Sequence, residues 1–137
     1  MASNESIEFV DRCYGKNYVR LLHVRRDGDV HYIKELEVNT ALSLSDTKDY
    51  LRGDNSSIVA TDSQKNTVYV LAKRHGVRTI EEFALRLSGH FLQKYGHVNY
   101  AHVHIVEKPW RRMNFQGQVR RPRIKYQGQV RSHDWIR

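Results

Sequence analysis

The chain has 137 residues, 39% of them hydrophobic, which suits one domain with a modest core. No apolar run approaches the roughly 20 residues that a membrane-spanning helix needs, and residues 1–8 lack the hydrophobic segment of a secretion signal. The single cysteine, Cys13, excludes an internal disulfide and a multi-cysteine metal site, and it fits a compartment that keeps thiols reduced.

The net charge of +8 is concentrated at the C-terminal end of the chain. Residues 111–137 hold eight Lys and Arg residues against one acid, Asp134, whereas residues 1–110 hold 15 basic and 14 acidic residues. A basic tail can bind phosphate backbones without sequence preference. This tail has few aromatic side chains and no recognised nucleic-acid motif. We therefore expect a solvated segment and no nucleic-acid partner.

The first elements in chain order are predicted to be two strands of an antiparallel hairpin. Residues 18–26 alternate loosely between apolar and polar side chains, and residues 27–29 supply turn chemistry. Residues 35–44 alternate better, as in a half-buried strand. Leu36, Val38, Leu42 and Leu44 face one way, and Glu35, Glu37, Asn39 and Ser43 face the other. Residues 46–60 are polar and rich in turn-forming residues.

Two helices are predicted next. Thr61 and Gln64 have the spacing of a capping box, so the first helix should run from Thr61 to about His75, with Gly76 just beyond its end. Residues 79–82 repeat the capping signature, as Thr79 and Glu82. One helical face then follows, formed by Ile80, Phe83, Ala84, Leu87 and Phe91. Gly96 ends this second helix, and residues 98–108 return to strand character.

The tail contains an 11-residue duplication, in which residues 115–120 recur as residues 126–131. We interpret it as a local duplication within a hairpin loop, followed by a last strand around residues 132–137. The alternative is that residues 114–137 are disordered. The domain boundaries that follow are an N-terminal tail over residues 1–12, an α+β domain over residues 13–113 and a basic tail over residues 114–137.

The start of the first helix is the first candidate site. Backbone N–H groups there lack intrahelical partners and the helix dipole favours negative charge, so an anion or an electron-rich ring edge suits the position. Thr61 adds a hydroxyl, and Asp62 and Ser63 add further polar groups. The simpler interpretation is that Thr61 only caps the helix.

Lysine and histidine side chains give two further candidates. Lys16 precedes the first strand, where it is either a solvated surface residue or a proton carrier whose pKa is lowered by burial or by another cation. His102 and His104 share one strand face and could bind zinc. A third ligand would come from His97, His90 or His23. No nucleophile motif, phosphate-binding glycine loop or dinucleotide fingerprint is present.

Six segments of the chain match, in the same order, segments of one known protein family. They are Tyr14–Asn17, Asp54–Thr67, His90-Phe91, Ala101–Val106, Trp110–Met113 and a variant closing segment, His133–Arg137. Together these segments resemble the urate oxidase (uricase) family over about residues 10–113. The run Asn-Ser-x-Ile-Val-Ala-Thr-Asp-Ser, at residues 55–63, is a specific signature of that family.

The resemblance implies the tunnelling fold (T-fold), in which an antiparallel sheet carries two helices on one face in the order ββααββ. Family chains hold two such domains in tandem, and four chains form a tetramer with active sites between subunits. We therefore expect a homo-oligomer or pairing with a second T-fold domain. The resemblance also implies a peroxisomal location. The chain ends Trp135-Ile136-Arg137 in place of the family's targeting tripeptide, which leaves a cytoplasmic location open.

The resemblance also implies a reaction: urate is oxidised by O₂ and water to 5-hydroxyisourate and hydrogen peroxide, with no metal or organic cofactor. Lys16 matches the family's catalytic lysine and Thr61 its partner threonine, which together act as a proton relay. The backbone N–H groups of Thr61 and Asp62 are expected to bind urate. The catalytic residues predicted are thus Lys16 and Thr61, the substrate-binding residues are Thr61 and Asp62, and no metal ligands are predicted.

Half of the family's site has no counterpart in this sequence. The family's second domain supplies a stacking phenylalanine, an arginine and a glutamine that clamp urate, an asparagine near the oxygen site and a histidine that completes the relay. We therefore expect this chain to be weakly active or inactive alone. Two alternatives remain open: a single-domain T-fold protein that binds a purine or pterin, with zinc at His102 and His104, or a non-catalytic remnant that pairs with intact uricase subunits.

Overall fold

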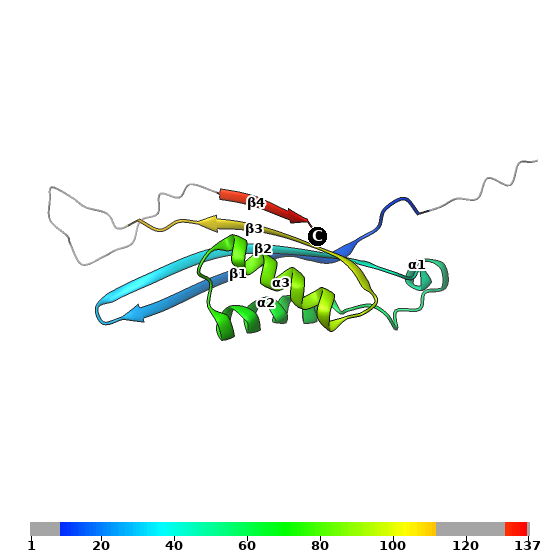
Figure 1. Cartoon of the computed structure of the whole chain (residues 1–137), viewed down its shortest axis with the longest axis horizontal. Coiled ribbons are helices and arrows are strands. Elements are labelled where there is room, and N and C mark those ends of the chain that lie inside the picture. The colour runs from blue at the N-terminus through cyan, green and yellow to red at the C-terminus, as the bar shows by residue number, and fades with distance from the viewer. Residues whose placement is uncertain (1–8, 112–130, 137) are drawn as a thin grey trace, which may run out of the picture.

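A computed structural model describes residues 9–111 and 131–136. The elements in chain order are β1 (Tyr14–Asp27), β2 (Val30–Leu44), α1 (Lys48–Arg52), α2 (Thr61–His75), α3 (Ile80–Lys94), β3 (Val98–Lys108) and β4 (Arg131–Ile136). The strands form one antiparallel sheet in the order β1-β2-β3-β4, and α2 and α3 lie against one of its faces (Figure 1). Apart from the short α1, this is the predicted ββααββ order.

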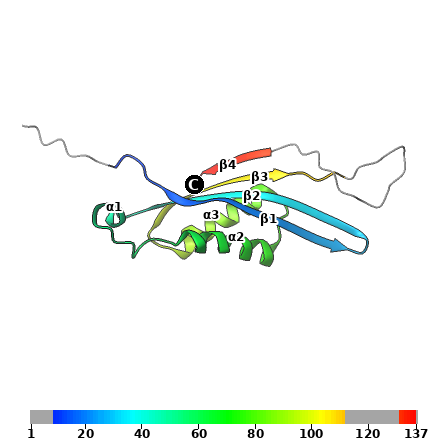
Figure 2. The same cartoon turned by 180° about the vertical axis from the view of Figure 1, so that it is seen from behind.

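The core lies between the sheet and the two long helices. Alternate residues of β2 are buried there, as the sequence predicted for Leu36, Val38, Leu42 and Leu44. The helices contribute Val68, Leu71, Ala72, Phe83, Ala84, Leu87 and Phe91. Seen from behind, the β1–β2 hairpin extends beyond the helices (Figure 2), which leaves Val30 and Tyr32 exposed near its tip. No helix in the described part of the chain is long and apolar enough to cross a membrane.

The two capping predictions had different outcomes. Thr79 caps α3 as predicted, because its Oγ1 accepts a hydrogen bond of 3.2 Å from the Glu82 N–H. The capping box at Thr61 was wrong: Ala60 is the N-cap residue, Thr61 is already helical, and no side chain caps α2. Gly76 does follow α2, with φ of 69°, and its N–H donates to the Ala72 carbonyl.

The structure changes two of the predicted elements and confirms the last strand. β1 begins at Tyr14, so Lys16 lies within the strand and not before it. The segment 46–60, which was predicted as turns, contains the five-residue helix α1, which ends at Gly53 in the left-handed conformation. A last strand was predicted around residues 132–137, and β4 occupies Arg131–Ile136 beside β3. The rest of the tail, residues 112–130, with nearly all of the duplication, lies outside the described residues.

β1 contains a bulge directly after Lys16. Lys16 pairs with Thr40 and Val19 pairs with Val38, so two residues of β1, Asn17 and Tyr18, oppose a single residue of β2. Tyr18 has a positive φ of 58°, a conformation that a bulky residue rarely adopts. Its N–H donates a hydrogen bond of 2.7 Å to the side-chain oxygen of Asn39, which holds the bulge in place.

The segment that leads into α2 is held against β1 by Tyr14. The Val59 N–H donates a 2.8 Å hydrogen bond to the Tyr14 hydroxyl, which lies 3.3 Å from the Val59 carbonyl oxygen and donates to it. Burial is the main cause that raises the pKa of Tyr14 above its usual 10.0. Further back, His97 Nε2 lies 2.8 Å from the Ser57 carbonyl oxygen. The approach to Thr61 is therefore fixed by the side chains of Tyr14 in β1 and of His97, the residue before β3.

We expect Gly15→Ala to lower the free energy of unfolding by about 1–3 kcal/mol, the usual cost of overpacking. A Cβ atom at Gly15 would overlap the Thr40 carbonyl oxygen, which belongs to the backbone and has no rotamer to adjust. Urea unfolding followed by circular dichroism measures the change. The matched control is Gly89→Ala in α3, where a Cβ atom meets nothing within 4 Å and the helix should gain about 0.5–1 kcal/mol. Equal effects of the two substitutions would contradict this account.

We expect Tyr14→Phe to lower the free energy of unfolding by about 1–2 kcal/mol near neutral pH, because the buried Val59 N–H loses its acceptor. The raised pKa of Tyr14 means that the folded state holds the phenolic proton more tightly than the unfolded state. Stability should therefore fall as the pH rises above 10, and the variant should lack this part of the fall. Urea unfolding near pH 7 and above pH 10 tests both points. Tyr50→Phe, at an exposed position, is the control and should change neither quantity.

Candidate functional site

Lys16 lies on the side of the sheet that carries α2. It pairs with Thr40, whose side chain contacts α2, and paired residues of antiparallel strands share a face. The pKa of the Asp62 carboxyl is lowered chiefly by a 3.0 Å hydrogen bond from Lys65 and by the charge of Lys65, and the charge of Lys16 adds a smaller effect. The structure thus brings the half-buried Lys16 within electrostatic reach of the first turn of α2.

The first turn of α2 presents backbone donors beside this lysine. The first intrahelical hydrogen bond runs from the Gln64 N–H to the Ala60 carbonyl, at 3.1 Å, so the N–H groups of Thr61, Asp62 and Ser63 precede the helical ladder. Thr61 is half-buried, whereas Asp62 and Ser63 are exposed. Aligned peptide dipoles make this end of the helix electropositive. The geometry suits an anionic or electron-rich ligand at the surface of the molecule.

Two buried polar residues connect the strands to the helix start, and sequence reasoning missed both. Gln64 is fully buried and Thr40 nearly so, at 0% and 1% exposure. Thr40 Oγ1 donates a 2.8 Å hydrogen bond to Gln64 Oε1, and Gln64 Nε2 donates a 3.2 Å hydrogen bond to the Val59 carbonyl. Thr40 Oγ1 also lies 3.5 Å from the Lys16 carbonyl oxygen. One feature of the sequence could have identified Thr40: it is a polar residue at a core-facing position of an alternating strand.

The histidines proposed as zinc ligands do not gather into a site. His102 and His104 lie on the face of β3 that points away from the core, because Ala101, Val103 and Ile105 between and beside them are buried. His104 Nδ1 lies 3.3 Å from the Asn39 side-chain nitrogen. Among the side chains that the structure describes, those of residues 9–111, no three from His, Cys, Asp or Glu are close enough to hold a metal ion.

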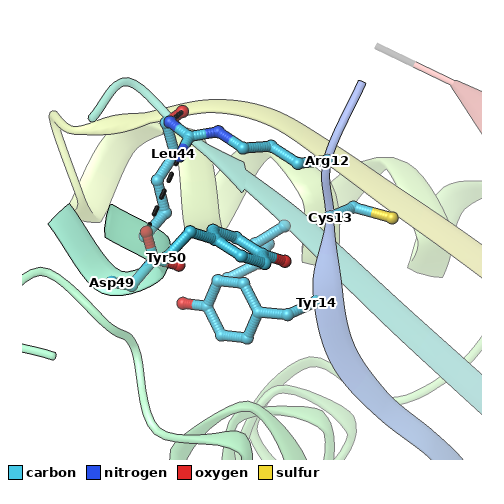
Figure 3. A pocket seen from close by; sticks show the side chains of 7 residues that line it. Arg12, Cys13, Tyr14, Leu44, Asp49 and Tyr50 are labelled. Atoms are coloured by element: carbon cyan, nitrogen blue, oxygen red, sulfur yellow. Dashed lines mark hydrogen bonds and ion pairs between the residues drawn. The ribbon is translucent and has the colours of Figure 1, made fainter. Parts of the chain in front are cut away.

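A small cavity lies elsewhere, between α1 and the start of β1. Figure 3 shows Arg12 reaching from the residues before β1 to Asp49 of α1; its Nη1 lies 3.6 Å from Asp49 Oδ1, and its Nη2 donates a 2.9 Å hydrogen bond to the Leu44 carbonyl. The cavity is lined by Arg12, Cys13, Tyr14, Leu42, Leu44, Asp49 and Tyr50. Its volume of about 10 Å³ holds about one water molecule. It contains neither Lys16 nor Thr61, so we assign it a structural role in anchoring α1.

Known proteins resemble this chain over most of its length. It is 58% identical over 106 residues to the uricase of Drosophila melanogaster, a match that covers 77% of this chain and 30% of that protein. It is 50% identical over 115 residues to the uricase of Danio rerio, which covers 84% of this chain and 39% of that protein. The matched part of the chain thus spans 30–39% of the length of these relatives.

Solved structures and a family model agree with these similarities. The crystal structure of uricase from Arthrobacter globiformis superposes with a TM-score of 0.74 at 38% identity and covers 79% of this chain and 37% of that one. The urate oxidase of Bacillus sp. TB-90 superposes with a TM-score of 0.65 at 25% identity, over 73% of this chain and 38% of that one. The uricase family model matches residues 12–137. The chain therefore belongs to the uricase family, and its α+β fold is that of the family's T-fold structures.

Proposed function

We propose that this chain contributes one half of a urate oxidase active site. In the reaction, urate gives two electrons to O₂, water supplies the new hydroxyl oxygen, and the products are 5-hydroxyisourate and hydrogen peroxide. Lys16 and Thr61 would move protons, and the backbone N–H groups of Thr61 and Asp62 would bind the urate ring. The observation that carries the proposal is the arrangement of Lys16 and the start of α2 in a chain of the uricase family: Lys16 pairs with Thr40 in the β1–β2 ladder, and hydrogen bonds join Thr40 through Gln64 to Val59.

The chemistry of these groups fits the proposed roles. Urate becomes a better electron donor as it loses protons, and the electropositive first turn of α2 favours the anion that results. Lys16 and the Thr61 hydroxyl offer the exchangeable protons that a relay needs, at the edge of the same turn. None of these groups requires a metal or an organic cofactor in order to act.

The remaining half of the site must come from another domain. Asp62 and Ser63 are exposed, so this chain alone leaves the proposed urate position open to water. Water weakens the hydrogen bonds and charges that stabilise a developing anion. A second T-fold domain, or a further copy of this chain, would cover the position by pairing with the sheet. The proposal therefore includes assembly as a condition for full activity.

We expect purified chain to oxidise urate slowly or not at all, and to gain activity when the remainder of Drosophila melanogaster uricase is co-expressed as a separate polypeptide. Loss of the ultraviolet absorbance of urate measures the rate. In that assembly, Lys16→Met and Thr61→Val should each lower turnover by roughly 10²–10⁴-fold, the usual contribution of a proton-transfer group. Lys73→Met is the control, because Lys73 is exposed in the last turn of α2.

Two results would count against this proposal. Turnover that survives Lys16→Met at the level of the Lys73→Met control would remove the relay role of that lysine. An assembly that forms, as judged by co-purification, yet leaves urate untouched would identify the chain as a non-catalytic remnant of the family.

A further inference from the structure

The core of this domain contains a polar side chain where an apolar one would pack. Gln64 lies on the inner face of α2, with the buried Val68 and Leu71 on the turns that follow. A buried amide lowers stability unless its groups are hydrogen-bonded. Both of its ends are satisfied here, by Thr40 Oγ1 at 2.8 Å and by the Val59 carbonyl at 3.2 Å. An apolar residue of similar size would fill the space without needing these two partners.

The two partners of Gln64 belong to the two parts of the proposed site. Thr40 pairs with Lys16 in the β1–β2 ladder, and its hydroxyl oxygen lies 3.5 Å from the Lys16 carbonyl oxygen. Val59 stands two residues before Thr61, and its peptide groups are also held by Tyr14 from β1. A single amide therefore joins Thr40, the β2 residue that pairs with Lys16, to the segment that leads into Thr61.

The geometry points to Gln64 as a positioning residue that fixes the first turn of α2 relative to Lys16, an inference that rests on the proposed function. Apolar contacts alone tolerate sliding and rotation of a helix on a sheet, because dispersion and hydrophobic forces have little direction. Hydrogen bonds are directional, and a shift of α2 would break both bonds and leave the buried Gln64 amide without Thr40 and Val59 as partners. Gln64 acts through Thr61 and Lys16, since its own side chain is fully buried.

Such positioning matters to proton transfer more than to folding. A displacement of about 1 Å at a reacting group can lower a rate by about 10²-fold even when the fold is unchanged. A residue that only fills the core would change stability, whereas a positioning residue would change turnover in a protein that remains folded. The two roles are therefore separable by experiment.

The test compares Gln64→Met, which keeps the length of the side chain but removes both hydrogen bonds, with Gln93→Met at an exposed position of α3. In ¹⁵N-labelled full chain, Gln64→Met should shift the amide signals of Lys16, Thr61 and Asp62 and speed hydrogen exchange in the first turn of α2. Gln93→Met should leave these signals in place. In the co-expressed assembly, Gln64→Met should lower kcat on the order of 10²-fold.

The conservative variant Gln64→Glu should restore the two hydrogen bonds at low pH only. The neutral acid of Gln64→Glu can accept from Thr40 and donate to the Val59 carbonyl, whereas the carboxylate cannot donate. Its amide signals should match those of the parent chain at low pH and those of Gln64→Met at high pH. If Gln64→Met fails to fold, a comparison of Thr40→Val with Thr40→Ser takes its place. Valine removes the hydroxyl that donates to Gln64, whereas serine keeps it.

The possible results separate this inference from the proposed function. Unchanged amide signals at Lys16 and Thr61 in folded Gln64→Met, or in folded Thr40→Val, would overturn the positioning role whatever the activity. Shifted signals together with unchanged kcat would also overturn it. If the parent assembly has no turnover, the proposed function fails, and the amide signals and their pH-dependent rescue still decide whether Gln64 fixes α2 to the β1–β2 ladder at Thr40.

Discussion

The peptide of Val59 is the point on which the arrangement of the candidate site depends. Loops normally run over the surface because buried backbone groups need partners, yet the loop between α1 and α2 enters the core at Val59, which is 7% exposed. Its N–H and carbonyl are satisfied by the Tyr14 hydroxyl and by the Gln64 amide. The loop is thereby tied to β1 on one side and to α2 on the other, and Thr61 follows two residues later.

The irregularity of β1 serves the same arrangement. Lys16 faces α2 because it pairs with the core residue Thr40, whereas Val19 reaches the core by pairing with Val38. Strict alternation from Lys16 would instead direct Tyr18 and Arg20 inward. The extra residue in the bulge reverses the alternation, so one strand presents a lysine near the helix start and apolar residues further along. The positive φ of Tyr18 costs on the order of 1 kcal/mol, and the hydrogen bond to Asn39 offsets this strain.

The sequence predicted those parts of the fold that local patterns encode. The alternation of β2, the apolar face of α3 and the cap at Thr79 need only neighbouring residues, and the structure confirms all three. The start of β1 was missed because its bulge breaks the alternation that marks a strand. The capping box at Thr61 failed because Gln64, which was expected to cap the helix, has its better partners in the core. Hydrogen bonds of this kind join residues from different elements of the fold, so no periodic sequence pattern predicts them.

The candidate site was predicted on different grounds, and the roles of its residues stay predictions. Local chemistry left Thr61 as a helix cap and Lys16 as a surface lysine, and the family resemblance singled them out, at residues 14–17 for Lys16 and at residues 55–63 for Thr61. What the structure adds is the physical connection between them, through Thr40, Gln64 and Val59. That connection lies wholly within this chain, so Thr40, Gln64 and Val59 hold the first turn of α2 beside the Lys16 strand pair without help from a second domain. In the proposed assembly, this preorganisation would lower the entropic cost of binding a partner domain, because the partner would complete the site but would not have to organise it.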